Sequence, residues 1–326
     1  MKGVAWRIGL FAAGLMVVGC APKAEAPGNP GASVAGGDKP RFALCPKSIN
    51  NPFFDAVRAG ARDAAKELKI PEPDWVGPTQ AIAGQQVTMI GDAITRGVKG
   101  LAISPNIPDT ITDVVARAMD SKVPTICFDS DAPKSRRICY VGTDNYRAGR
   151  LAGEQMKKLM GGQGKVLIVT GGLAAANLNE RIRGYHDALM GTPGITDAGP
   201  PEACDDNQSK AHQIIQDFLL GHPDTKGIFA VGLWAAIPAA QILHARGLSG
   251  KVKVVGFDVL KEELLLLKSG DIQALLGQRP HRIGYDTVKM LWDLHQGKKP
   301  ARVINDTGID VVTQANVDEF LSKAAM

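Results

Sequence analysis

The chain has 326 residues and a formal net charge of +5, from 38 Lys and Arg against 33 Asp and Glu. At roughly 150 residues per domain, this length predicts two domains. The composition is 44% hydrophobic and 22% charged, which excludes disorder over the whole length, and the small basic excess without a dense Lys/Arg cluster argues against nucleic-acid binding.

The first 19 residues are typical of a secretory signal peptide. Lys2 and Arg7 form a positive start, and the apolar run over 8–18 is too short for a hydrocarbon core of ~30 Å, which takes about 20 helical residues. The run ends in Val17-Val18-Gly19-Cys20, which resembles a bacterial lipobox. We therefore expect cleavage before Cys20, lipidation of that cysteine and anchoring in the cell envelope, facing the periplasm or the cell exterior. A plain signal peptide followed by a chance cysteine is the alternative.

Residues 20–40, which begin with this cysteine, are predicted to form a flexible linker. They are rich in Pro, Gly, Ala and Ser and have hardly a periodic apolar residue. Removal of residues 1–19 also removes Lys2 and Arg7, so the net charge falls from +5 to +3. The exported body is therefore nearly neutral.

From residue 41 onward, short apolar runs alternate with amphipathic stretches, which predicts alternating strands and helices. The helix over 52–68 is the clearest, because Val57, Ala61 and Leu68 belong to an apolar series at three- and four-residue steps. The first series comprises strand 42–45, helix 52–68, strand 100–103, helix 111–119 and strands 124–128 and 138–141.

The same rhythm restarts after residue 145. This second series comprises a helix to residue 160, strand 165–170, helices 180–190 and 211–220, strand 227–231, helix 238–246 and strand 252–257. The apolar runs do not alternate with polar residues, which indicates strands covered on both faces and hence parallel sheets with helices on either side. The sequence therefore predicts an α/β fold of two doubly wound parallel-sheet lobes.

Sequence motifs for catalysis are missing. Residues 46–51 after the first strand lack the G-x-G-x-x-G turn of dinucleotide-binding enzymes, and the glycine-rich segment 161–165 departs from a phosphate loop. The six histidines form no H-x-x-x-H pair, and no G-x-S-x-G elbow is present. We expect no catalytic residue, no metal and no cofactor, and an exported enzyme is the weakest functional alternative.

Four cysteines remain if Cys20 carries lipid, and they form no C-x-x-C pair. Cys45, Cys127 and Cys139 lie in apolar, strand-like segments and are predicted to be small buried side chains. A disulfide between Cys127 and Cys139 is compatible with an oxidising compartment, but the sequence leaves it open.

Polar and aromatic residues follow the ends of several predicted strands, where open parallel sheets bind ligands. They are Asn51, Phe53, Phe54, Ser104, Asp129, Arg181, Asp258 and Gln278. Carboxylates, a guanidinium and amides together can satisfy the hydroxyls of a neutral polyol. Four of them also have a structural alternative: Phe54 belongs to the buried helix face, the two aspartates suit turns, and Arg181 at a helix start suits solvent.

Three segments, 50–54, 142–145 and 254–258, resemble the ribose-type periplasmic sugar-binding proteins of ABC importers. The resemblance extends from residue 41 to about 314. It implies a periplasmic binding protein type I fold, in which two lobes are joined by three crossovers near Thr143, Arg279 and Thr307 and close over one monosaccharide. The first lobe would comprise 41–143 plus 279–306, and the second 144–278 plus 307–326.

The resemblance also implies roles for the candidate residues. Asn51 would hydrogen-bond sugar hydroxyls, and Phe53 with Phe54 would stack on one face of the ring. The remaining polar ligand positions of the family fall on Asp129, Arg181, Asp258 and Gln278.

The sequence departs from the ribose-binding pattern at four positions. Ribose binders usually have Asn at Ser104, Arg at Ser130, an aromatic residue at Cys204 and Asn at Gly232. Trp234 offers a replacement stacking face. These departures put ribose itself in doubt, and another pentose, a hexose or a deoxy sugar fits equally well.

The resemblance favours a lipid-anchored, monomeric binding protein that delivers a monosaccharide to an ABC permease in the inner membrane. The alternative is a receptor that presents a bound sugar or furanose-like signal to a membrane sensor kinase. A sugar-responsive repressor shares the two-lobe body but needs an N-terminal helix-turn-helix, and the signal peptide and linker take its place here.

Overall fold

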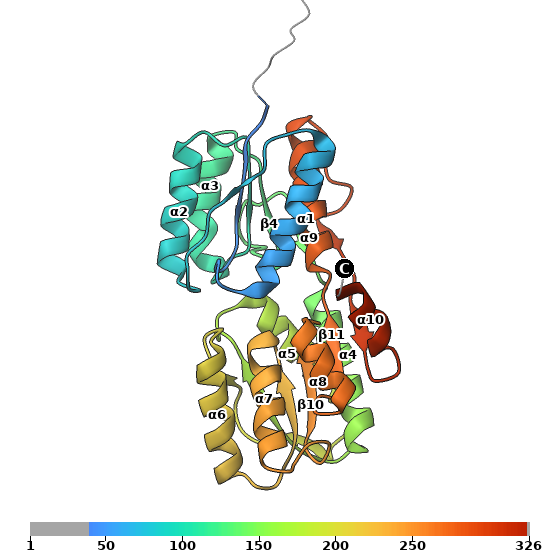
Figure 1. Ribbon diagram of the computed structural model, residues 1–326. Helices are drawn as coiled ribbons and strands as arrows, with labels where there is room; N and C mark the ends of the chain where they lie inside the picture. The colour runs from blue at the N-terminus through green and yellow to red at the C-terminus, as the bar shows by residue number, and fades with distance from the viewer. Residues whose placement is uncertain (1–38, 325–326) are drawn as a thin grey trace, which may run out of the picture. The chain divides into compact units, whose positions relative to one another are not determined.

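The computed structural model describes residues 39–324. The predicted signal peptide, Cys20 and nearly all of the linker lie outside the described residues. Within them, the strands form two sheets, shown with their helices in Figure 1. No described helix has both the length and the apolar character needed to span a membrane.

The first sheet has the strand order β12-β5-β4-β3-β1-β2, and all of its pairings are parallel. The strands are β1 (Phe42–Cys45), β2 (Asp74–Trp75), β3 (Gly100–Ile103), β4 (Thr125–Phe128), β5 (Tyr140–Gly142) and β12 (Ile304–Asp306). The helices of this lobe are α1 (Pro52–Leu68), α2 (Ala83–Thr95), α3 (Thr112–Asp120), which follows the 3₁₀ turn Pro108–Ile111, and α9 (Pro280–His295).

The second sheet has the order β13-β11-β10-β9-β6-β7, with β8 also paired to β6, and only β13 runs antiparallel to its neighbour. The strands are β6 (Gly164–Thr170), β7 (Ile195–Asp197), β8 (Glu202–Ala203), β9 (Thr225–Ala230), β10 (Lys253–Phe257), β11 (Ala274–Gly277) and β13 (Asp310–Val312). The helices are α4 (Asn145–Met160), α5 (Ala176–Leu189), α6 (Gln208–Gly221), α7 (Leu233–Ala245), α8 (Lys261–Ser269) and α10 (Val317–Ala324).

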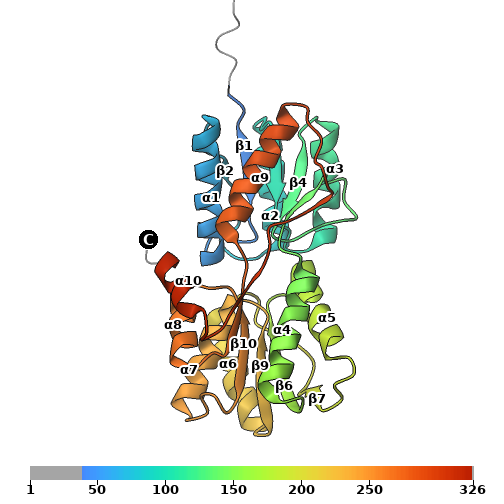
Figure 2. The same cartoon turned by 90° about the vertical axis from the view of Figure 1, so that its right-hand side faces the viewer.

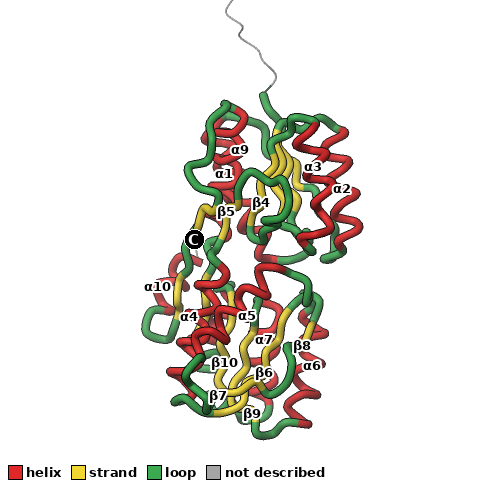
Figure 3. Tube along the Cα trace, turned by 180° about the vertical axis from the view of Figure 1, so that it is seen from behind, coloured by secondary structure: helices red, strands yellow, loops and turns green. Residues whose placement is uncertain are grey.

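Helices cover both faces of each sheet. In the first lobe α1 and α9 pack together on one face and α2 and α3 lie on the other (Figures 1 and 2). In the second lobe α4 and α5 form one layer and α6 and α7 the other, with the strands between them in Figure 3. Every residue of β1, β3 and β4 is buried, as expected for strands covered on both sides. The predicted α/β architecture of two doubly wound lobes is confirmed.

The α4–α5 pair is unusually close. A Cβ added at Gly149 in α4 would lie 2.0 Å from the backbone oxygen of Arg181 in α5, and one at Gly184 in α5 would lie 2.1 Å from that of Tyr146. The two backbones therefore touch without intervening side chains. This contact fixes where α5 lies against α4, and therefore the point from which the side chain of Arg181 extends.

Within the described residues the chain passes between the sheets three times, between β5 and α4, between β11 and α9, and between β12 and β13. Polar contacts join these crossovers. The backbone N–H of Asp144 donates to Asp306 Oδ1 at 3.2 Å, and Arg279 Nη2 donates to Asp310 Oδ1 at 2.6 Å. The predicted connection of the lobes by three crossovers is confirmed.

Several predicted element bounds were wrong. The helix predicted over 180–190 begins at Ala176. Its N-cap residue Ala175 provides no side-chain hydrogen bond, so the sequence has no capping residue that would mark this start. Arg181 therefore lies in the second turn rather than at the helix start. The helix predicted from Pro238 begins at Leu233, with the proline inside it. Helices α2, α8, α9 and α10 were not predicted.

The four cysteines of the described residues are free and buried. The predicted burial of Cys45, Cys127 and Cys139 is confirmed, and Cys127 and Cys139 are separate thiols in the structure. The backbone N–H of Cys127 donates to the carbonyl oxygen of Cys139 at 2.9 Å, so the two residues are joined through the sheet.

Candidate ligand-binding pocket

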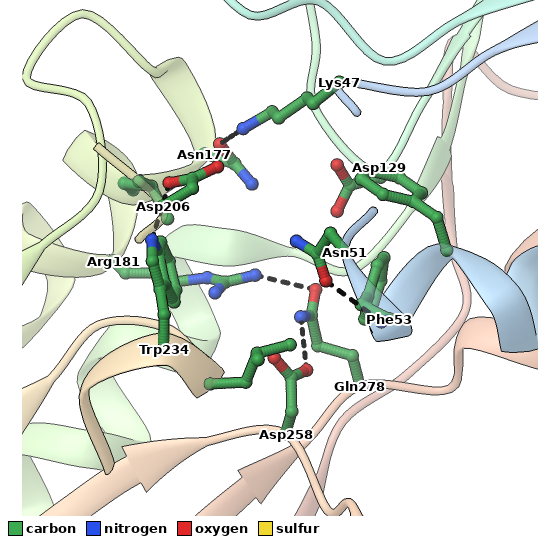
Figure 4. Close-up of a pocket in the computed structure, with 13 residues that line it drawn as sticks. Lys47, Asn51, Phe53, Asp129, Asn177, Arg181, Asp206, Trp234, Asp258 and Gln278 are labelled. Carbon is green, nitrogen blue, oxygen red and sulfur yellow. Dashed lines mark hydrogen bonds between the residues drawn. The ribbon is translucent and has the colours of Figure 1, made fainter. Parts of the chain in front are cut away.

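A pocket with an empty volume of about 340 Å³ lies where strand ends of both sheets meet (Figure 4). Its lining consists of Lys47, Asn51, Phe53, Phe54, Asp129, Asn177, Leu178, Arg181, Asp206, Leu233, Trp234, Asp258 and Gln278. The sequence candidates other than Ser104 are therefore brought together in one place.

The side chain of Asn51 caps a helix and also lines the pocket. It is the N-cap of α1, and its Oδ1 accepts a hydrogen bond from the backbone N–H of Phe53 at 3.0 Å. Pro52 at the first helical position fits the same helix start. Because capping uses the oxygen, the side-chain N–H groups of Asn51 remain to donate.

The two phenylalanines that follow are both core and lining. The ring of Phe53 lies edge-on to that of Phe54 at a centroid distance of 5.2 Å, and Phe54 lies edge-on to Phe128 at 6.2 Å. Both are almost completely buried yet contribute to the pocket wall. Phe54 therefore belongs both to the buried core and to the wall of the pocket.

Asp129 and Asp258 directly follow β4 and β10 and share an uncommon backbone conformation. Their φ angles are 59° and 77°, in the left-handed region that few non-glycine residues adopt but that Asp tolerates. Asp129 Oδ2 accepts from Ser104 Oγ at 2.6 Å, and Asp258 Oδ1 accepts from Gln278 Nε2 at 2.8 Å. The two turns thus direct both carboxylates into the pocket.

Burial raises the pKa of Asp258 to about 6, although the Arg181 guanidinium and the Gln278 amide act in the opposite direction. This carboxyl therefore titrates close to neutral pH. Its ionisation state is one that a bound ligand can alter.

Arg181 is held from three sides while only 2% exposed. Its Nε donates to Asn145 Oδ1 at 2.9 Å, Nη1 to the carbonyl oxygen of Val231 at 2.9 Å and Nη2 to Gln278 Oε1 at 2.7 Å. The guanidinium also lies over the Phe257 ring, 4.1 Å from its centroid. Since a guanidinium carries five N–H bonds, these three contacts leave two further N–H donors on a side chain that lines the pocket.

Ser104 does not line the pocket, contrary to its predicted ligand contact. It is 0% exposed and donates to Asp129 from behind. The structure thus gives it the role of orienting the carboxylate.

Three polar lining residues were missed from the sequence. Lys47 Nζ donates to Asn177 Oδ1 at 2.7 Å, and Asp206 Oδ1 accepts from Trp234 Nε1 at 2.8 Å. Burial lowers the pKa of the Lys47 ammonium, against the attraction of Asp129 and Asp206. Burial likewise raises the pKa of the Asp206 carboxyl, against the attraction of Lys47.

The charges in the pocket nearly balance. Two cations, Lys47 and Arg181, face the carboxyl groups of Asp129, Asp206 and Asp258. No group of three or more His, Cys, Asp or Glu suited to a metal ion occurs within residues 39–324. Closely spaced donors and acceptors with aromatic walls suit a neutral ligand that has several hydroxyls.

The chain is similar to known proteins over most of its length. A family model described as a periplasmic binding protein domain matches residues 42–299. The ribose import binding protein RbsB of Salmonella typhimurium is 29% identical over 261 residues, which cover 80% of this chain and 86% of that protein.

Solved structures of sugar-binding proteins are also similar to this chain. A solute-binding protein of an ABC transporter from Burkholderia graminis, crystallised with D-arabinose, has a TM-score of 0.82 and 38% identity over 86% of this chain and 98% of its own. GanP, a glucose-galactose binding protein from Geobacillus stearothermophilus, has a TM-score of 0.81 and 31% identity over 86% and 99%. The chain is thus similar, over most of its length, to proteins whose names describe sugar binding.

Proposed function

Since the chain belongs to the periplasmic binding protein family, as a ribose-type sugar-binding member, we propose that it captures a monosaccharide in the pocket of Figure 4 and delivers it to an ABC importer. Members of this family bind solutes rather than transform them, and this chain is proposed to act in the same way. Export to the cell envelope follows from the same membership.

One observation carries the proposal. Ionised and amide groups from both lobes converge on a space that also has aromatic walls, and Arg181 ties them together through Gln278, which in turn donates to Asp258. A sugar hydroxyl donates one hydrogen bond and accepts others, so it can join such a network without leaving a buried group unpaired. The apolar C–H face of the ring would lie on Phe53 or Phe54.

The charges of the pocket favour neutral sugars over anionic ones. The two cations, Lys47 and Arg181, already face the three carboxyl groups of Asp129, Asp206 and Asp258. A sugar phosphate or uronate would therefore add negative charge where carboxyl groups already outnumber cations, and desolvated like charges repel strongly. The proposed ligand is therefore an unmodified pentose, hexose or deoxy sugar.

A thermal-shift screen against monosaccharides tests the proposal, with sugar phosphates as the matched anionic controls. A sugar present at 100 times its Kd should stabilise the folded protein by about 2.7 kcal/mol, whereas the phosphates should not. Failure of every neutral sugar to stabilise the protein would overturn the proposed function.

We also propose that Cys20 carries a lipid and that the protein acts as a monomer. The support for lipidation is the position of Val17-Val18-Gly19-Cys20 at the end of the apolar run. A lipid anchor would keep the binding protein close to the membrane that holds its permease.

A further inference from the structure

The turn that carries Asp129 is strained. The backbone N–H of Ser130 donates to the carbonyl oxygen of Phe128 at 2.6 Å, which closes a three-residue turn around Asp129, whose φ is 59°. A γ-turn with a positive φ at its central residue is the rare, strained form. Such a conformation persists only where the surrounding structure holds it. The place of the Asp129 carboxylate in the pocket of Figure 4 therefore depends on what holds this turn from behind.

The hydroxyl of Tyr140, in β5, holds the turn. It donates to the carbonyl oxygen of Asp129 at 2.9 Å and to that of Thr143 at 3.0 Å. Tyr140 is 3% exposed and does not belong to the residues that line the pocket. Burial raises the pKa of its hydroxyl well above the usual range, so the group stays protonated and remains a donor. Tyr140 therefore supports Asp129 without facing a bound sugar.

Gly142 makes room for this hydroxyl. A Cβ at Gly142 would lie 2.4 Å from Tyr140 Oη and 3.0 Å from the backbone nitrogen of Asp129. The carbonyl oxygen of Gly142 also accepts a hydrogen bond from the backbone N–H of Thr307 at 2.9 Å. The hydroxyl of Tyr140 thus lies beside the point at which the first and third crossovers are joined.

Asn145, the first residue of α4, continues the contact into the second lobe. Its Nδ2 donates to the carbonyl oxygen of Thr143 at 3.1 Å and to Tyr140 Oη at 3.3 Å. Its Oδ1 accepts from Arg181 Nε at 2.9 Å. Asp129 of the first lobe and Arg181 of the second are therefore joined behind the pocket by two side chains that do not line it.

We propose that Tyr140 is a positioning residue for sugar binding, because its hydroxyl holds the Asp129 turn in the conformation that the sugar requires and fixes that turn to the first crossover. This proposal rests on the proposed function as a sugar-binding protein. Without the hydroxyl, the turn relaxes in the free protein, and part of the binding free energy is spent on restoring it. The effect is lost affinity, although no contact with the sugar is removed.

Tyr140→Phe tests the proposal by removing a single oxygen atom. The probe is the neutral monosaccharide that binds the wild-type protein most tightly, chosen by calorimetric titration from D-ribose, D-arabinose, D-allose, D-galactose and the other sugars of the thermal-shift screen. The variant should bind this sugar roughly five- to fiftyfold more weakly, because the carbonyl oxygen of Asp129 loses its donor at 2.9 Å. Gly142→Ala, which leaves no room for the hydroxyl, should also lower the affinity.

Tyr185→Phe is the matched control. Tyr185, in α5, is also completely buried, but its hydroxyl has no hydrogen-bond partner among the described residues. Removal of this oxygen should therefore leave the affinity for the sugar unchanged.

Two double variants distinguish positioning from a general loss of structure. Asp129→Gly removes the carboxylate, and glycine adopts a positive φ without strain, so Tyr140→Phe should then cause almost no further loss of affinity. Asp258→Gly removes a carboxylate from the corresponding position of the second lobe, where φ is also positive. In that background Tyr140→Phe should still cause its full loss.

The possible outcomes separate the two proposals. Unchanged affinity of Tyr140→Phe or of Gly142→Ala would overturn the positioning role. Equal losses in Tyr140→Phe and Tyr185→Phe, or equal further losses in the two double variants, would overturn it as well. A wild-type protein that binds no neutral monosaccharide would instead overturn the proposed function, and the positioning role with it.

Discussion

The carboxyl group of Asp258 shows how a single residue links ligand binding to stability. Its pKa rises from 3.8 to about 6 on folding, mainly because the group is buried. Between these pH values the folded protein binds more protons than the unfolded chain. The contribution of Asp258 to the free energy of unfolding is therefore largest below pH 4 and is lost as the pH rises through 6.

Replacement of Asp258 by Asn should therefore have opposite effects on stability and binding. At pH 7 we expect a free energy of unfolding higher by on the order of 2 kcal/mol, because a buried charge is removed. We expect sugar affinity to fall roughly ten- to a hundredfold, because a charged acceptor is lost from a desolvated site. Urea unfolding and calorimetry measure the two effects.

The pH dependence serves as the internal control. The stability difference between Asp258→Asn and the wild-type protein should disappear at pH 4, where both side chains are neutral. A variant that is less stable than the wild type at pH 7 would contradict the assigned cause of the pKa shift.

Cys20 provides a second test at the scale of one residue. Cys20→Ser removes the thiol that would carry lipid, so the exported protein should move from the membrane fraction to the soluble fraction. Fractionation of cells followed by immunoblotting measures this change. Retention of the variant in membranes would contradict lipidation at this position.

Helix contacts show how element packing positions the site. Gly149 lets α4 touch the backbone of α5 at Arg181, whereas Gly84 in α2 has open space where a Cβ would lie. These two helical glycines form a matched pair, because one substitution meets backbone and the other meets nothing.

Gly149→Ala should destabilise the protein by about 1–3 kcal/mol and weaken sugar binding, because α5 and with it Arg181 must move. Gly84→Ala should be neutral or stabilising by up to about 1 kcal/mol, because alanine favours helix more than glycine does. Denaturant unfolding and calorimetric titration of both variants measure the two effects. Equal stability of the two variants would show that the close contact between α4 and α5 does not contribute to the free energy of unfolding.

Clear local signals explain which elements the sequence predicts. Helix α1 runs over the predicted residues because Asn51, Pro52 and the apolar repeat all mark it. The start of helix α5 was predicted four residues too late, because Ala175 has no side chain that could cap a helix. The two-residue strands β2 and β8 are too short to show a pattern.

The strength of the local sequence signal also explains which pocket residues could be predicted. Asp129 and Asp258 follow strong apolar strands and were found. Asp206 follows the two-residue β8, and Asn177 lies in the missed first turn of α5. Lys47 also lies just after β1, as Asn51 does, so the rule that ligands gather at strand ends could have included it.

At the scale of the whole molecule, we expect ligand binding to draw the lobes together. Asn51, Phe53 and Asp129 precede the first crossover, and Arg181 and Asp258 follow it. A monosaccharide can contact both sets only when they are close, and closure excludes water that would weaken each hydrogen bond. The ligand stabilises the closed form by its differential affinity for that form.

Small-angle X-ray scattering tests this closure. The radius of gyration of the protein should decrease when its sugar is added to saturation, and an added sugar that does not bind should have no effect. An unchanged radius at saturation would reject closure even where calorimetry confirms binding.

The sheet order has a consequence for the order in which the protein is made. Strand β12 and helix α9 complete the first lobe but follow β6–β11 of the second lobe in the chain. A ribosome therefore releases the segment that covers α1 and the β5 edge only after the main strands of the second lobe have emerged. Synthesis of the first lobe therefore begins before that of the second lobe and ends after its main strands. Until residue 306 has emerged, the apolar face of α1 and the open edge of β5 stay exposed, and these are the surfaces that a chaperone would bind.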